Sequence, residues 1–250
     1  MRKASLAAIL FAAIAIPAVP GFAAQDSYDR VLPMRSGGSL LLENVTGSIN
    51  IVGWDREAVE VQAVKKANSP ADLPSVQIAA VANDNRVEIK TVYPADENVE
   101  VAVNYTVRVP RRVWLEQVAT VNGAVHVSGV EGAGELRSVN GDVTVTDSRG
   151  GFSAHTTNGD IREEVAQLVS SQPLTLETIN GSVALAVPPD TPAALEVRCW
   201  NGDFHSDFAM TMVGAYSPRS FQGSLGGGGT SVHLHTVNGP VRVQALSPGI

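Results

Sequence analysis

The sequence has 250 residues, with 18 basic residues against 25 acidic ones and a formal net charge of −7. An acidic chain repels phosphate backbones, so this balance argues against nucleic acid as a partner. A single cysteine, Cys199, excludes an internal disulfide and a zinc site built from cysteines, and we expect that thiol to be buried and inert.

Residues 1–23 have the plan of a secretory signal peptide. Arg2 and Lys3 precede an apolar run that ends in prolines and small residues. We predict cleavage after Ala23 and export to the periplasm, the cell surface or the medium. Loss of Arg2 and Lys3 leaves 16 of the 18 basic residues against 25 acidic ones, a net charge of −9. No later apolar run is long enough to span a bilayer, so we expect no stable membrane span after cleavage.

Residues 26–115 are predicted to form an N-terminal β section that contains one degenerate repeat and caps the array behind it. A stack of strands needs such a cap, because a bare end exposes unpaired backbone. The strands expected here lie within 39–67, within 75–92 on both sides of Asn83-Asp84-Asn85, and within 99–110, where Pro110 stops the last one.

Residues 116–250 repeat a Val-Asn-Gly turn between two stretches of alternating apolar residues. Asn-Gly in this setting is a hairpin signal, whereas a period near 20 residues signals a solenoid or an array. A degenerate copy places Gly47 in phase with the others. The glycines of the later copies are Gly123, Gly141, Gly159, Gly181, Gly202 and Gly239.

Positions in register with each turn share residue types. Residues four before each Asn and two after each Gly are apolar, and the residue two before the Asn is small, as crowded stacked backbones require. Glu163 and Ser206 break the apolar rule four residues after the Gly. An apolar residue directly before most of the Asn is expected at a corner that turns inward: Val121, Val139, Ile179, Trp200 and Val237.

These columns predict an all-β fold: a single-chain, right-handed β-helix-like solenoid of about seven coils, stacked ~4.8 Å apart. The alternative is an antiparallel β-sandwich or meander, in which each copy is a hairpin and Leu136 faces Val145. Each column keeps the same residue type from copy to copy. This favours the solenoid, because equivalent residues of successive coils stack on one another there. The outward columns hold polar residues such as His155, Glu177 and Arg198 and are predicted to form solvated faces.

The last spacing, 37 residues, contains an insertion over 209–229 that ends in four consecutive glycines. We expect a flexible loop or a wide turn there, with a mobile binding loop as the functional alternative. The final copy ends at Val243 with little chain behind it. Its edge is expected to lie open, so we predict weak self-association through this C-terminal coil.

Three segments carry a family resemblance: VTGSINIVGWDREAVEVQAVKK, then VPRRVWLEQVATVNGAVHVSGVEGAGELRSVNGDVTV, then GSLGGGGTSVHLHTVNGPVRV. From about Leu40 to Val243 the chain resembles the bacterial "putative adhesin" β-strand-repeat domains of unknown function. The resemblance implies an all-β, solenoid-like fold and a cell-envelope location. It implies no established activity and supplies no catalytic motif.

Two groups of side chains are candidates for chemistry. Asp142 and Asp160, with Asp203 in the same column, would lie about 5 Å apart on adjacent coils, as paired acids do, although Asn-Gly-Asp is also ordinary turn chemistry. The residues Asp203, His205 and Asp207 share one face of a strand, as His233 and His235 do. Either set could hold a metal, and the two sets join only if their coils stack, although exposed His on polar faces are commoner than ligands.

The leading interpretation is an exported, non-enzymatic cell-envelope repeat protein, adhesin-like or a scaffold, which binds an envelope protein or a glycan. The alternatives are a polysaccharide-acting β-helix enzyme and a metal-binding envelope module. Neither a nucleophile elbow nor a phosphate loop occurs in the sequence, and Cys199 sits in the small inward column, a poor place for a thiolate. We therefore assign no catalytic, cofactor-binding or metal residue and expect no cofactor.

Overall fold

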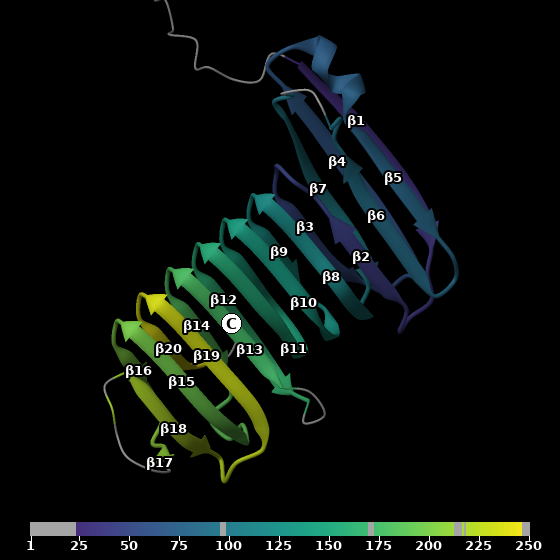
Figure 1. Cartoon of the computed structure of the whole chain (residues 1–250). Helices are drawn as coiled ribbons and strands as arrows, with labels where there is room; N and C mark the ends of the chain where they lie inside the picture. The colour runs from purple at the N-terminus through teal and green to yellow at the C-terminus, as the bar shows by residue number, and fades with distance from the viewer. Residues whose placement is uncertain (1–23, 96–98, 170–172, 213–216, 218, 247–250) are drawn as a thin grey trace, which may run out of the picture.

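The computed structural model describes residues 24–95, 99–169, 173–212, 217 and 219–246. The predicted signal peptide, residues 1–23, lies outside the described residues. The described chain consists of β-strands and one short 3-10 helix, η1 (Pro70–Ser75), which confirms the all-β class. Figure 1 shows the strands as one elongated stack that begins with the N-terminal strands.

The strands form two layers, one from the stretches before the turns and one from the stretches after them. The pre-turn layer contains, in spatial order, β2 (Ser39–Glu43), β8 (Arg112–Asn122), β10 (Glu131–Asn140), the second half of β11 (Val143–Asn158), β13 (Leu174–Asn180), β19 (Thr230–Asn238) and β15 (Ala193–Asn201). The post-turn layer contains β3 (Ile49–Trp54), β9 (Val125–Ser128), the first half of β11, β12 (Ile161–Leu168), β14 (Val183–Val187), β20 (Val241–Ala245) and β16 (Phe204–Ser206).

Within each of these two series of strands, neighbouring strands pair in parallel, and equivalent positions of the repeat lie opposite each other. Leu136 lies opposite Val118 on one side and Ala154 on the other. Hairpins would instead pair the two strands around one turn antiparallel. The repeats are therefore solenoid-like coils, and the hairpin meander is wrong for this part of the chain.

Further strands extend both layers at the N-terminal end, and the strands predicted there all form. In the post-turn layer β3 pairs in parallel with β7, whereas β7 with β4 and β4 with β1 pair antiparallel. In the pre-turn layer β2 pairs in parallel with β6, and β6 pairs antiparallel with β5. Their bounds are β1 (Ala24–Pro33), β4 (Ala58–Ala67), β5 (Gln77–Ala82), β6 (Arg86–Val92) and β7 (Val101–Pro110).

The core lies between the two layers and is built from the predicted inward columns. Alternate residues of each strand are buried, as the period of 2 in a strand requires. The column four residues before the Asn is almost fully enclosed: Val118, Leu136, Ala154, Leu176, Val197 and Leu234.

One core position holds a carboxylate. Glu163 lies in register between Val145 and Leu185 and is fully buried. Its Oε1 accepts a hydrogen bond from the Phe152 N–H at 2.8 Å, whereas Oε2 has no partner among the described residues. Burial raises the pKa of Glu163 to about 8, against the opposing effect of the Phe152 hydrogen bond.

Glycine is required at the turns because successive coils touch there. A Cβ on Gly141 would lie 2.2 Å from the carbonyl oxygen of Gly123, and one on Gly159 would lie 2.3 Å from that of Gly141. The small column beside the turn has a second role that the sequence analysis missed. The hydroxyls of Thr120, Ser138, Thr156, Thr178 and Thr236 each donate to the carbonyl oxygen of a turn glycine on the adjacent coil.

The turn asparagines form a ladder along the stack. From Asn140 onward, each side-chain amide donates to the side-chain oxygen of the preceding Asn in the stack at 2.8–2.9 Å, as in stacked amide ladders of other parallel β structures. The order of the ladder is Asn122, Asn140, Asn158, Asn180, Asn238 and Asn201.

Replacing Asn158 with alanine should lower the free energy of unfolding by about 1–2 kcal/mol, because it breaks two ladder bonds, those with Asn140 and Asn180. Asn122→Ala, at the end of the ladder, breaks the bond with Asn140 and should cost about half as much. Denaturant unfolding measures both. Equal costs for the two variants would show that the number of ladder bonds broken does not determine the loss of stability.

The stack does not follow chain order at its C-terminal end. The last repeat, β19 with β20, lies between β13 with β14 on one side and β15 with β16 on the other, as Figure 1 shows for the yellow strands. The expectation that this repeat ends the array with an open edge is wrong. The basis for self-association through the C-terminal coil is thereby removed.

The insertion makes this rearranged order possible. Its strand β18 (Ser220–Leu225) pairs antiparallel with the outer side of β15, and β17 (Thr211–Met212) pairs with β18. Gly226, Gly227 and Gly228 have φ of 57°, 85° and 89°, and the glycine run leads the chain past Pro192, at the start of β15, into β19. The glycine run is therefore a wide turn that carries the chain from β18 across the start of β15 to β19.

Candidate functional site

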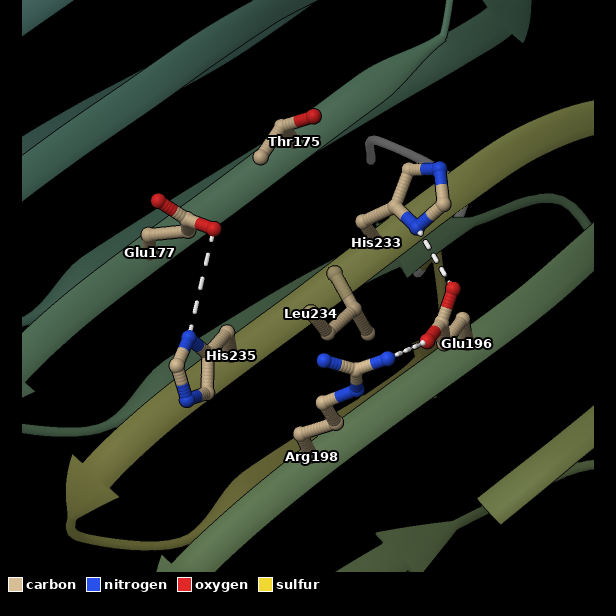
Figure 2. A pocket seen from close by; sticks show the side chains of 7 residues that line it. All are labelled: Thr175, Glu177, Glu196, Arg198, His233, Leu234 and His235. Atoms are coloured by element: carbon tan, nitrogen blue, oxygen red, sulfur yellow. Dashed lines mark hydrogen bonds and ion pairs between the residues drawn. The ribbon is translucent and has the colours of Figure 1, made fainter. Parts of the chain in front are cut away.

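The outer face of the pre-turn layer carries a shallow depression of about 270 Å³ over β13, β19 and β15. The residues one, three and five positions before each Asn point to this face, because the side chains of a strand alternate. Figure 2 shows the residues that line the depression. They are Thr175, Glu177, Glu196, Arg198, His233, Leu234 and His235. We call the five ionisable members, Glu177, Glu196, Arg198, His233 and His235, the His–Glu face.

Glu196 is held by a basic group on each of two strands. Arg198 Nη2, two residues along β15, lies 2.5 Å from Glu196 Oε1, and His233 Nδ1 on β19 lies 3.1 Å from Oε2. The carboxylate thereby fixes the orientation of both partners, as Figure 2 shows.

A second carboxylate, Glu177, lies between two imidazoles. His235 Nδ1 is 3.9 Å from Glu177 Oε1, and His155 Nδ1 on β11 is 3.2 Å from Oε2. His155 also approaches Glu135 on β10, at 3.9 Å. A continuous row of alternating acidic and basic groups therefore crosses four neighbouring strands, β10, β11, β13 and β19.

Fold stability does not account for this row. The side chains of this row and of the His–Glu face are 27–65% exposed, and ion pairs between exposed groups contribute about 0–1 kcal/mol each. The arrangement presents fixed hydrogen-bond donors and acceptors on a rigid sheet, which suits the recognition of a polar partner.

The apolar residues before the Asn lie beside this row and point outward. Val121, Val139, Ile179 and Trp200 are all exposed, which makes the expected inward corner wrong. The physical reason is strand alternation: a residue one before the Asn shares its face with the residue three before it. Trp200 is the most exposed of them, at 64%, and the Arg219 guanidinium lies 5.7 Å from its ring centroid.

Two aspartates that directly follow turn glycines accept hydrogen bonds from backbone N–H groups. Asp142 Oδ1 accepts a hydrogen bond from the Asp160 N–H at 2.8 Å, and Asp160 Oδ1 accepts one from the Ser182 N–H at 2.7 Å. Asp203 is three coils away from Asp160, because the coils of Ser182 and Pro240 lie between them. This geometry is that of turn capping and gives no support to a pair of catalytic acids.

The histidine sets proposed for a metal occupy different layers. The coils of His205 and His233 do stack, but His205 lies on β16, whereas His233 and His235 lie on β19. His205 pairs with Asp207 at 3.4 Å, and both line a separate depression with Asp203. Within the described part of the chain, three or more His, Cys, Asp or Glu residues nowhere gather in a group that could hold a metal ion.

Cys199 occupies the inward small column and is buried. Burial raises the pKa of its thiol, and the negative charge of Asp203 raises it further. Both effects disfavour the thiolate, so this residue has the opposite environment to that of a nucleophile.

Family membership follows from the sequence match over the repeats. Residues 116–244, just over half of the chain, match the model of the Toastrack DUF4097 family. The chain belongs to this family. The resemblance to a domain of unknown function is thereby confirmed at the level of the family. No curated protein matches the sequence of this DUF4097 chain.

Several crystal structures align with this DUF4097 chain at low identity. A "putative cell adhesion protein" from Clostridium sporogenes is 11% identical, with a TM-score of 0.43 over 88% of this chain and 100% of that one. A "putative adhesin" from Bacteroides fragilis is 11% identical, with a TM-score of 0.40 over 88% and 97%. A "putative lipid binding protein" from Parabacteroides distasonis is 7% identical, with a TM-score of 0.36 over 91% and 98%. These scores are too low to support a functional comparison.

Among the residues that the structure describes, no helix has the length and apolarity needed to cross a membrane.

Proposed function

We propose that this DUF4097 chain is an exported, non-enzymatic repeat protein of the cell envelope that acts as an adhesin-like or scaffold module. In this proposal it binds an envelope protein or a glycan through the His–Glu face. The observation that carries the proposal is the row of oriented, partly exposed carboxylates and imidazoles from Glu135 to His235, which fold stability does not account for. The signal-peptide pattern of residues 1–23 supports export to the periplasm or the cell surface.

The non-enzymatic part of the proposal is supported by how the candidate acids are used. Asp142 and Asp160 each accept a backbone N–H of the next coil, which occupies one carboxylate oxygen of each. A general acid would instead have to present its carboxyl group to a substrate.

The proposal also includes a finer description of the fold. We infer about seven right-handed coils with the Val-Asn-Gly turn as their unit. The parallel pairings from β2 and β3 to β15 and β16 support the coil number, and the strong preference for right-handed parallel crossovers supports the hand.

Two matched charge reversals test the binding face. Arg198 pairs with Glu196 and Arg162 pairs with Glu164, each two residues away on the same strand, but the two arginines lie in opposite layers. Arg198→Glu should weaken binding of the mature chain to envelopes of its own host by about tenfold or more, whereas Arg162→Glu should leave it unchanged. Labelled protein titrated onto whole cells and isolated envelopes gives the affinities. Equal binding by both variants would remove the His–Glu face from the proposal.

A further inference from the structure

Trp200 stands at the edge of the His–Glu face, on the same strand. It follows Arg198 by two residues on β15, so both side chains point outward and start about 7 Å apart. Across the sheet it lies in register with Val237 on β19, which in turn lies in register with Ile179 on β13. An exposed indole therefore continues an apolar row that runs beside the charged depression.

An exposed tryptophan of this kind needs an explanation beyond packing. The residue is 64% exposed, so most of its surface gains nothing from burial in the fold. Tryptophan is also one of the residue types enriched among the residues that dominate binding interfaces, where its flat apolar ring covers a large area.

The depression beside Trp200 suits a ligand that both donates and accepts hydrogen bonds. Glu196 uses one oxygen toward Arg198 and one toward His233, and a carboxylate retains further lone pairs for a ligand. Arg198 has five N–H donors in a planar fork, more than its ion pair employs. Because the acids are already paired with basic groups, the face favours a neutral hydroxylated ligand over a strongly charged one.

The size of the depression limits the ligand. Its volume, about 270 Å³, lies just below the ~300–1,000 Å³ range of small-molecule pockets, and it is open to solvent on one side. It fits one ring with its substituents, while the open side lets a longer chain continue along the face. Neighbouring strands are ~4.8 Å apart, so Ile179, Val237 and Trp200 provide an apolar track across three of them.

We propose that Trp200 and the His–Glu face form a binding site for a neutral pyranose oligosaccharide. One ring stacks its C–H face on the Trp200 indole, and its hydroxyls exchange hydrogen bonds with Glu196, Arg198 and His235. This inference rests on the proposed function, since it names the class of partner that the same face binds. A second copy of the chain and a lipid surface are the competing occupants.

A tryptophan substitution with a matched control tests the site. Trp114 on β8 also points outward from the pre-turn layer and is 40% exposed, but it lies in register with Ser39 and Ala133, away from the His–Glu face. The probes are cellotetraose, chitotetraose and maltotetraose, titrated into the mature chain by calorimetry and by tryptophan fluorescence. At least one probe should bind and change the emission of the native chain. Trp200→Ala should lose affinity about tenfold or more and lose the fluorescence change, whereas Trp114→Ala should keep both.

A second variant separates a direct contact from a general effect on the surface. Glu196→Gln removes the charge that orients Arg198 and His233 but keeps the size of the side chain, so it should also weaken the same probe. Circular dichroism and the unfolding midpoint verify that each variant is folded.

Three results would overturn the inference. The first is that none of the three probes binds, the second is that Trp200→Ala binds them as the native chain does, and the third is that Trp200→Ala abolishes self-association or vesicle binding instead. If envelopes still bind through Arg198 while no probe binds, the oligosaccharide site fails and the proposed envelope-binding function stands. If Arg198→Glu also has no effect on envelope binding, both fail.

Discussion

Glu163→Gln should raise the free energy of unfolding at pH 7 by about 3 kcal/mol. In the folded chain the carboxyl has a pKa of about 8 instead of the ordinary 4.5, because it is fully buried. Between these values the unfolded chain ionises Glu163 while the folded chain must keep it protonated. Stability therefore falls as pH rises from 4.5 to 8, by up to about 1.4 kcal/mol per unit, and the dependence ends outside that window. Glutamine retains the acceptor for the Phe152 N–H but cannot ionise.

The measurement is denaturant unfolding of the native chain and the variant at several values from pH 4.5 to pH 8. The two curves should meet near pH 4.5 and separate steadily above it. Glu164→Gln is the matched control, because this neighbouring carboxylate is partly exposed and paired with Arg162. It should change stability little and leave the pH dependence in place. Parallel curves for the native chain and Glu163→Gln would show that Glu163 does not titrate as a buried acid.

Gly159→Ala should lower the free energy of unfolding by about 3 kcal/mol, at the upper end of the range for overpacking a tight site. The new Cβ would sit 2.3 Å from the carbonyl oxygen of Gly141, which belongs to rigid backbone of the adjacent coil. The coils must then separate at a point where Thr156 bonds to the same oxygen and Asn158 bonds to Asn140. Because the φ of Gly159 is outside the left-handed region, the cost measures the clash and not backbone strain.

Gly37→Ala supplies the comparison. Gly37 has φ of 86°, and a Cβ there would meet nothing within 4 Å, so this variant carries the strain of the backbone without a clash. We expect a loss of about 1 kcal/mol for it in the same unfolding experiment. A loss at Gly159 no larger than that at Gly37 would mean that the stack relaxes around the extra methyl group without disruption.

The parallel stacking and the core could be predicted because both depend on a period that the sequence displays directly. Leu136 and Val143 recur at fixed distances from each Asn-Gly, and a buried column of stacked coils requires that recurrence. The N-terminal strands could also be predicted, because turn residues such as Asn83-Asp84-Asn85 separate their apolar stretches.

The order of the last coils was not predictable from the columns. Leu176, Leu234 and Val197 occupy equivalent positions, so any order of their strands buries the same kinds of side chain. In the observed order β18 pairs with the outer side of β15, a pairing with no local signal in the sequence beyond the 37-residue spacing.

The candidate site could be predicted from the sequence only in part. The polar column with His155, Glu177 and Arg198 was predicted to be a solvated face, but the pairing of Glu196 with His233 depends on β19 lying beside β15. The apolar character of Trp200 predicts an inward corner, whereas the alternation of side chains along the strand points it outward. Glu163 is an exception in its apolar column, and the sequence alone does not tell whether such a side chain points to solvent or into the core.

Because β19 and β20 lie between strands that precede them in the sequence, the stack can close only after these two strands have been synthesised. Synthesis runs from the N-terminus, so β13 and β15 both exist before the strand that joins them has been made. Until then each has a side edge of unpaired amide and carbonyl groups, a state that invites pairing with other chains. Late closure over a long sequence separation also slows folding, because the entropy of the intervening loop is lost before the contacts form. A chaperone that shields these two edges until residues 230–245 arrive would act at the step where this molecule is most vulnerable.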